Sequence, residues 1–140
     1  MSTDAMERAL AELGKLIGIP DLTFDGDGIS HLKGDKQQQL AIKRDDRNFR
    51  FVVVGLVALE LPEWLDRAVI EELLALGLSP LRDDGAGVGL DSSSGAIVLH
   101  QSFRLDQNDS EQLRDGLVQF IRLQAHWSER LSFATMDTLM

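Results

Sequence analysis

The sequence of 140 residues contains no cysteine, so it can form neither a disulfide framework nor a thiolate metal site. The absence of cysteine also fits a reducing cytoplasm. The longest apolar run, residues 51–59, is far shorter than the roughly 20 residues that a membrane-spanning helix needs. The charged residues 1–13 contain neither the apolar core nor the cleavage pattern of a secretory signal. We therefore expect a cytoplasmic protein that is not embedded in a membrane.

Basic residues are scarce as well. Fourteen Lys and Arg face 23 Asp and Glu, and the formal net charge is −9. Such a surface repels a nucleic-acid backbone unless the basic residues are segregated into a patch. The one compact basic cluster, within residues 43–50, is interrupted by Asp45 and Asp46, which indicates a solvated turn. With 44% apolar residues, a chain of this length can bury a core and fold as one domain.

Catalytic motifs are also missing. The three histidines, His31, His100 and His126, do not have the HExxH spacing of a helical zinc site. The sequence has no cysteine nucleophile and no GxSxG elbow. We therefore expect a binding module without catalytic residues, metal ion or cofactor.

Two glycine-rich stretches resemble ligand-binding loops, but the residues around them do not fit such loops. Residues 25–28 read Asp-Gly-Asp-Gly, but a calcium loop starting there would have Ile29, Ser30 and Lys36 at its fifth, sixth and twelfth positions. The stretch is instead typical of a hairpin turn. Residues 85–89 resemble a phosphate loop, but they lead into a predicted strand and no Walker lysine follows.

Hydrophobic periodicity predicts the first helix over residues 4–17. Asp4 and Glu7 have the spacing of a capping box, and Gly18 and Pro20 are placed to end the helix. Strands are expected over 22–24, 29–33, 37–43 and 49–57, and the last of these is rich in β-branched and aromatic residues.

The second helix is predicted over 62–76, with Pro62 at its first turn and Gly77 and Pro80 at its end. Its apolar arc is too broad for one contact with a sheet. The residues that form it are Leu65, Val69, Ile70, Leu73, Leu74 and Leu76. A two-fold copy of the chain would bury the excess. The alternative is that Ile70 and Leu74 pack under a loop of the same chain.

A hairpin over 88–105 and a helix after Asp109, capped together with Gln112, complete the pattern. Residues 131–140 are expected to form a loose tail of a single domain spanning 1–140. The order helix–strands–helix–strands–helix predicts an α+β fold, with three helices on a twisted antiparallel sheet, in a homodimer.

Several segments, taken in order, are also typical of one known family. They are Ile17-Gly18-Ile19-Pro20 with Leu22, Asp25 and Gly28; Leu61-Pro62; Leu73-Leu74; Leu76-Gly77-Leu78; Gly87 to Asp91 with Gly95 and Leu99; and Phe103-Arg104-Leu105 with Asp109, Leu113, Leu117, Phe120 and Trp127. Together they resemble the Tir-chaperone family of class I type III secretion chaperones. The sequence departs from that family at Ala75, where an asparagine is common after the leucine pair.

The resemblance implies a homodimer joined through the second helix, without nucleotide, cofactor or chemistry. The implied dimer residues are Leu65, Val69, Ile70, Leu73 and Leu74. The implied partner is a secreted effector, whose extended N-terminal segment binds grooves on the chaperone and is kept competent for secretion. We expect these contacts at Ile17, Leu22, Phe24, Leu32, Leu40 and Ile42, although strand alternation does not show which face is exposed. The resemblance implies neither a nucleic acid nor a membrane as a partner.

Two other functions remain open at this stage. The same fold could serve a regulatory module that binds a cytoplasmic partner protein, including a chaperone that captures an anti-activator. A small hydrolase or isomerase could be built on the scattered acidic residues and histidines, and a deep pocket in which they converge would favour it.

Overall fold

The computed structural model describes the backbone of residues 4–139 and the side chains of residues 4–132. The elements follow the predicted order, with one additional short helix. They are α1 (Ala5–Ile17), β1 (Ile29–Lys33), β2 (Gln39–Asp45), β3 (Arg50–Ala58), α2 (Arg67–Leu76), α3 (Ser79–Asp83), β4 (Gly87–Leu90), β5 (Ile97–Arg104) and α4 (Ser110–Leu139). The α+β class and the antiparallel sheet are therefore confirmed.

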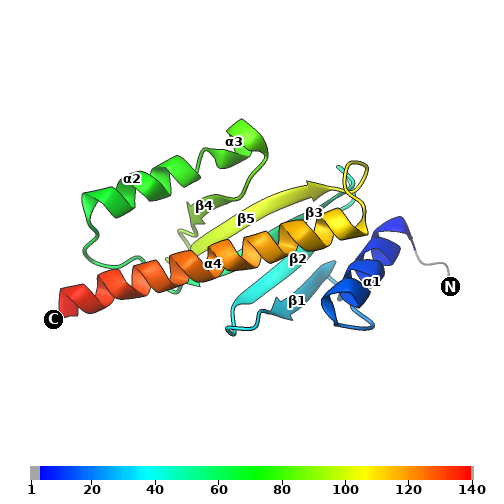
Figure 1. The fold of residues 1–140 in the computed structure, drawn as a ribbon, viewed down its shortest axis with the longest axis horizontal. Helices are drawn as coiled ribbons and strands as arrows, with labels where there is room; N and C mark the ends of the chain where they lie inside the picture. Colours follow the sequence, from blue (N-terminus) through cyan, green and yellow to red (C-terminus); the bar gives the residue numbers. More distant parts are fainter. Residues whose placement is uncertain (1–3, 140) are drawn as a thin grey trace.

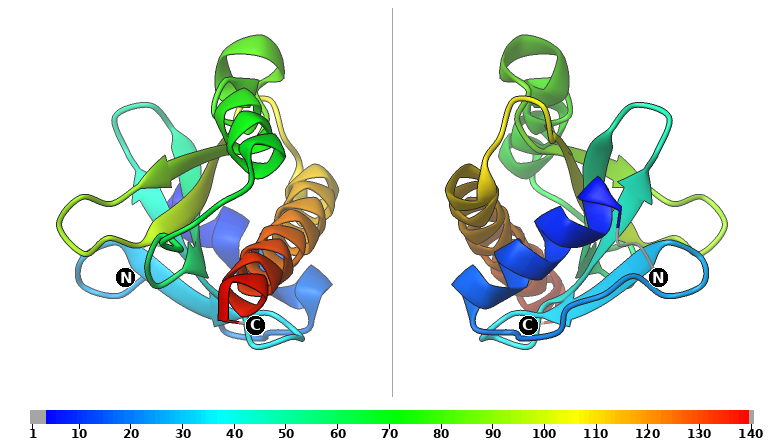
Figure 2. Two further views of the ribbon diagram at one scale, coloured as in Figure 1. Left: turned by 90° about the vertical axis from the view of Figure 1, so that its left-hand side faces the viewer. Right: turned by 90° about the vertical axis from the view of Figure 1, so that its right-hand side faces the viewer.

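The five strands form one antiparallel sheet in the order β1-β2-β3-β5-β4. The long helix α4 crosses the sheet, and α1 lies on the same face near β1 (Figures 1 and 2). The core lies between the sheet and these helices. Its largest fully buried apolar side chains are Leu10, Leu13, Ile42, Phe51, Val53, Leu99, Phe120 and Leu131.

Glycine allows α4 to approach the sheet closely at two points. A Cβ on Gly116 would lie 2.4 Å from Phe103 Cε1, and one on Gly55 would lie 2.7 Å from Gln124 Cδ. Both distances are far inside van der Waals contact, so a larger residue would push α4 away from β3 and β5. Because this close packing fixes the position of α4 on the sheet, it also fixes the positions of the other described side chains of α4.

The predicted ends of α1 are confirmed. The Asp4 carboxylate accepts a hydrogen bond from the Glu7 N–H at 2.8 Å, as expected of an N-cap. Gly18 ends the helix with a φ of 81°, in the left-handed region that glycine enters without steric cost. Met6, Leu10 and Leu13 are buried, so α1 presents its apolar stripe to the core.

The predicted strand over residues 22–24 is wrong. Asp21 has a φ of 62°, and the Ile19 N–H bonds to the Gly14 carbonyl at 2.8 Å, so the chain folds back against α1. Leu22 is buried there beside Gly14. Residues 22–24 are fixed by the packing of Leu22 and Phe24 against the core, and they pair with no strand among the described residues.

The predicted start of the second helix is also wrong, because α2 begins at Arg67 and not at Pro62. Leu61 and Trp64 are exposed, so their side chains do not stabilise a helical turn there by packing. Asp66 takes the extended N-cap conformation instead. Pro80 does not simply end this region, since it lies in the first turn of α3, where its missing N–H costs nothing.

The start of α4 matches its predicted capping box. Asp109 and Gln112 exchange side-chain and backbone hydrogen bonds, both at 2.8 Å. The helix continues to Leu139, and Leu131 is buried in the core. The single domain over 1–140 and the loose tail over 131–140 stay predictions.

Candidate partner-binding surfaces

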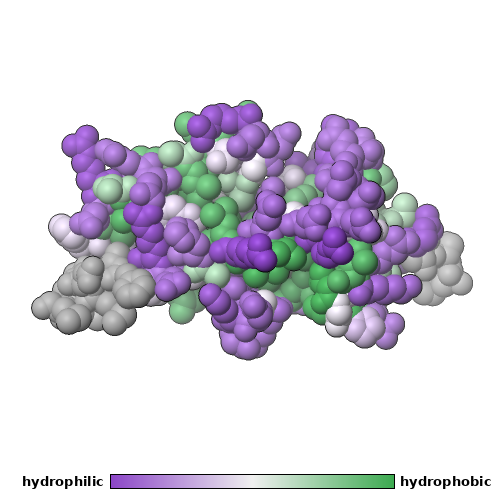
Figure 3. Space-filling model, in the orientation of Figure 1, coloured by the Kyte–Doolittle hydropathy of each residue, from purple (hydrophilic) through white to green (hydrophobic). Residues whose placement is uncertain are grey.

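An apolar groove lies where α1, the end of β1 and α4 meet. Its volume is ≈ 370 Å³. The apolar side chains that line it are Leu16, Ile17, Ile19, Leu32, Leu117, Val118 and Ile121. Figure 3 shows a hydrophobic patch in this region, beside α4 and over α1 and β1, bordered by hydrophilic side chains. We call it the α1/α4 groove.

Local contacts fix the walls of the α1/α4 groove relative to one another. The Ser110 hydroxyl donates to a Glu12 carboxylate oxygen at 2.7 Å and ties the start of α4 to α1. Gly34 follows β1, and a Cβ there would lie 3.2 Å from Ile121 Cγ2. The β1 turn therefore approaches α4 closely, and Leu32 forms part of the groove floor.

Strand β1 gives this region an open sheet edge. It pairs with β2 on one side and forms the end of the sheet on the other. His31 and Lys33 are exposed on it. An edge strand presents unpaired N–H and C=O groups, which an extended peptide can extend by strand addition.

The predicted effector-contact residues separate into three environments. Ile17 and Leu32 line the α1/α4 groove, although Leu32 is as deeply buried as Leu22. Leu22, Leu40 and Ile42 are buried in the core, and Ile42 has 0% of its surface exposed. Ile42 therefore supports the sheet and has no surface to offer a partner, because α1 and α4 cover this face of the strands.

Phe24 belongs to a different cluster. It is half-buried, its ring packs edge-on against Phe51 with centroids 5.8 Å apart, and the Arg44 guanidinium lies over it at 5.3 Å. The contact with Arg44 is a cation–π arrangement.

Sequence reasoning missed several groove residues. Leu16 and Val118 lie outside the regular apolar stripes of their helices, and Ile19 follows the end of α1, yet all three line the groove. Val118 and Leu16 are also among the exposed large apolar side chains. An apolar residue beside the core stripe was the available signal, but only the packing of α1 on α4 brings these side chains together.

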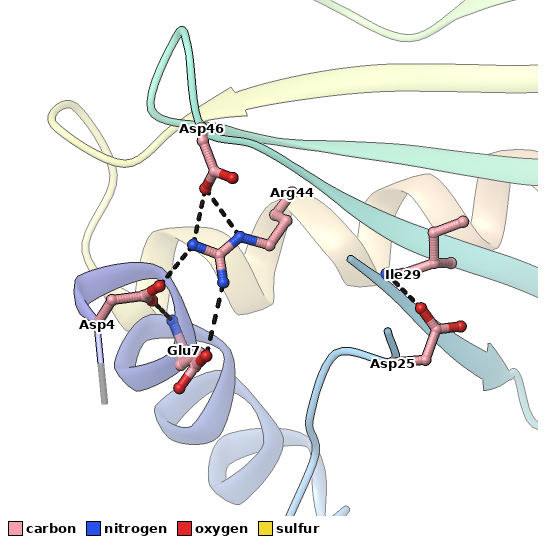
Figure 4. A network of polar contacts seen from close by, with 6 residues as sticks. All are labelled: Asp4, Glu7, Asp25, Ile29, Arg44 and Asp46. Carbon is pink, nitrogen blue, oxygen red and sulfur yellow. Dashed lines mark hydrogen bonds and ion pairs between the residues drawn. The ribbon is translucent and has the colours of Figure 1, made fainter. Parts of the chain in front are cut away.

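A polar network fixes the start of α1 to the end of β2, and Arg44 lies at its centre (Figure 4). Its guanidinium is 2.6 Å from Asp4, 2.7 Å from Asp46 and 3.7 Å from Glu7. The backbone hydrogen bond from Glu7, and then Arg44, lower the pKa of Asp4, and the hydrogen bonds to Asp4 and Asp46 raise the pKa of Arg44.

Asp25 shapes the turn before β1, as Figure 4 also shows. Its carboxylate accepts hydrogen bonds from the Ile29 N–H at 3.0 Å and the Asp27 N–H at 2.8 Å. These bonds lower the pKa of Asp25. The residues 25–28 therefore form a side-chain-capped turn, as the sequence indicates.

A second apolar surface covers α2, α3 and their flanks. Leu74 is 70% exposed and Ile70 is 42% exposed, whereas Val69 is buried and Leu65 and Leu73 are half-buried against the core. Other exposed apolar side chains on these elements and beside them are Trp64, Leu78, Leu81 and Leu90. The alternative in which Ile70 and Leu74 pack under a loop of the same chain is thereby contradicted. We call this surface the α2 face.

An ion pair links α2 to α4. Arg130 on α4 pairs with Glu72, and its guanidinium lies over the Trp127 ring at 5.2 Å.

The described residues show no metal cluster. Within residues 4–132, no three side chains among His, Asp and Glu come close enough to hold an ion. His31 lies 3.8 Å from Asp25, and His126 packs edge-on against Trp127. In the part of the chain that the structure describes, no helix combines the length and the apolar character of a membrane span.

Solved structures that are similar to the chain include chains of three complexes. A chain of the HopA1–SchA chaperone–effector complex is 23% identical, with a TM-score of 0.75 over 91% of this chain and 99% of that one. A chain of the ExsC–ExsE complex is 22% identical, with a TM-score of 0.73 over 90% and 92%. A chain of the heterodimeric ExoU–SpcU complex from the type III secretion system of Pseudomonas aeruginosa is 20% identical, with a TM-score of 0.66 over 90% and 97%. These similarities show a shared fold.

The sequence comparison adds the family. No curated protein sequence matches the chain. The family model described as the Tir chaperone protein (CesT) family matches residues 8–128, which is most of the sequence. The chain therefore belongs to the Tir chaperone protein (CesT) family.

Proposed function

We propose that this protein is a type III secretion chaperone. It binds the extended N-terminal segment of a secreted effector and keeps that segment competent for secretion. It acts in the bacterial cytoplasm as a homodimer, and it does no chemistry. Family membership supports this function, and so does the similarity to a complex described as chaperone and effector.

The α1/α4 groove beside the open edge of β1 is the observation that carries the proposal. An extended segment needs two things from its receptor: strand groups to pair with its backbone, and pockets for alternate side chains. The edge of β1 supplies the first and the groove supplies the second. A segment held in this way is prevented from folding, which is what threading through a secretion channel requires.

The α2 face is the proposed dimer surface. Ile70 and Leu74 point away from their own core, and the neighbouring exposed leucines enlarge the apolar area. Monomeric proteins rarely expose a contiguous apolar surface of this kind. A second copy of the chain, applied through a two-fold axis, would bury it.

The test is a pull-down of the tagged chain from its native bacterium, followed by limited proteolysis of the proteins that co-purify. We expect a secreted protein in which only the N-terminal segment is protected. Val118→Gln, in the groove, should lose this partner. Val54→Gln should keep it, because Val54 is a valine of equal exposure, 36%, on a central strand outside the groove. Recovery of a folded cytoplasmic protein, protected throughout, would favour the regulatory module instead.

A further inference from the structure

The border of the α1/α4 groove has a charge opposite to that of the protein. Lys33, Arg114 and Arg122 line the groove, and Asp35 is the one acidic side chain among its lining residues. The whole chain, in contrast, carries 14 basic and 23 acidic residues. The charged side chains that line this apolar groove are thus mainly basic, although the molecule as a whole is acidic.

Acidic side chains of the described part of the chain neutralise little of this positive charge. Among the described residues, Lys33 and Arg122 take part in no ion pair and no hydrogen bond through their side chains. Arg114 contacts Asp115 at 3.1 Å, and both of these side chains are more than one third exposed. An exposed pair of adjacent residues is weak and exchanges easily for another carboxylate.

Helix geometry gives the two arginines a definite spacing. Arg114, Val118 and Arg122 follow one another at intervals of four residues and all line the groove. Since a helix rises about 1.5 Å per residue, the two arginines are about 12 Å apart along α4. An extended peptide advances about 3.3 Å per residue, so it covers that distance in three to four residues.

We infer that the α1/α4 groove selects an extended effector segment whose apolar side chains are flanked by two acidic residues three to four positions apart. This inference rests on the proposed function and adds a specificity to it. The apolar side chains fill the groove, and the two carboxylates pair with Arg114 and Arg122. The apolar floor favours a peptide over a simple polyanion, because a phosphate chain would leave that floor in contact with water.

Selection from a displayed library of random 16-residue peptides tests the inference without knowledge of the effector. The baits are the wild-type chain, the groove variant Val118→Gln, the double reversal Arg114→Glu/Arg122→Glu, and a matched reversal Lys43→Glu/Arg47→Glu. Lys43 and Arg47 are exposed and lie outside the groove. Both double variants replace two basic residues by glutamate, so they have the same net charge. Thermal unfolding of each bait checks that it is folded.

We expect peptides selected by the wild-type chain to contain paired Asp or Glu at the stated spacing beside apolar residues. The double reversal should bind these peptides at least tenfold more weakly, and added salt should weaken wild-type binding. The matched reversal should bind them within about threefold of wild type, as expected of remote surface charges.

Two other results separate the inference from the proposed function. Apolar peptides without acidic enrichment, lost by Val118→Gln but bound equally by the double reversal, would overturn the charge selection and leave the chaperone function standing. Recovery of no peptide whose binding depends on Val118 would overturn both.

Discussion

Arg44 Nη2 donates a hydrogen bond to Asp4 Oδ2 at 2.6 Å and joins two residues that lie 40 positions apart in the sequence. Asp4 also caps α1, so one carboxylate both begins the helix and fastens it to the end of β2. Because α1 forms a wall of the α1/α4 groove, this pair couples the stability of the fold to the shape of the proposed binding site.

Removal of Arg44 should destabilise the fold. In Arg44→Ala the cation–π contact with Phe24 and the ion pair with Asp4 are both lost, so the variant should unfold at a lower urea concentration than the wild type. The free energy of unfolding in urea measures the loss. Arg47→Ala serves as the control, since Arg47 is exposed and forms no ion pair with a described residue. Equal stability of the two variants would contradict the structural role of Arg44.

The fold should lose stability in acid through its capping aspartates. The pKa values of Asp4 and Asp25 are lowered from 3.8, mainly by hydrogen bonds from backbone N–H groups. A carboxyl with a lowered folded pKa stabilises the protein above its unfolded value, and this stability is lost as the pH falls through the folded value. Urea unfolding between pH 6 and pH 2.5 should therefore show a decline that begins near pH 4. Asp25→Asn keeps the hydrogen-bonding oxygen without the charge, and its decline should be shallower; an unchanged slope would exclude this contribution.

A charge on the α2 face should separate the proposed dimer without unfolding the protomer. Leu74→Asp would bury an unpaired carboxylate in an apolar interface, at a cost of about 3 kcal/mol, which is a more than hundredfold weaker dimer. Sedimentation velocity should then report a monomer. Leu73→Asp would split the dimer as well, but Leu73 also packs on its own core, so that variant mixes dissociation with unfolding.

Leu59→Asp is the matched control for Leu74→Asp. Leu59 is 78% exposed and precedes α2 in the connection from β3. The Leu59→Asp variant should have the same sedimentation coefficient as the wild type. If Leu74→Asp sediments as the wild type does, the assignment of the dimer to the α2 face is wrong.

Gln124 is a buried polar side chain on which the contact of α4 with the sheet depends. It is 0% exposed, and its amide nitrogen donates to the Gln39 carbonyl at 2.8 Å and to the Leu56 carbonyl at 2.9 Å. Gln124→Leu would leave both carbonyls without these donors and should cost about 2 kcal/mol of unfolding free energy. Gln119→Leu, on the exposed side of the same helix, should change stability by less than about 0.5 kcal/mol. Similar stabilities for the two variants in urea would contradict the role given to Gln124.

The helix ends could be predicted because their signals are short-range. Asp4 bonds to a group three residues away, and the reciprocal bonds of Asp109 and Gln112 span the same distance. Such contacts form within one turn and depend little on the rest of the chain. The same reasoning failed at Pro62, which suits a first helical turn but lies between the exposed side chains Leu61 and Trp64. Local preference alone does not stabilise a helix.

The sequence by itself determined the alternation of the strands, the caps of α1 and the N-terminal cap of α4, the excess apolar arc of α2 and the family resemblance. Only the tertiary structure decided which face of each strand is exposed. Leu40 and Ile42 became core because α1 and α4 settled on their side of the sheet. Leu16, Val118 and Arg122 became neighbours of one groove because α1 lies across the start of α4, although more than 100 residues separate the first of them from the others. Periodicity along one element does not predict which residues of different elements lie together, because that depends on how the elements pack.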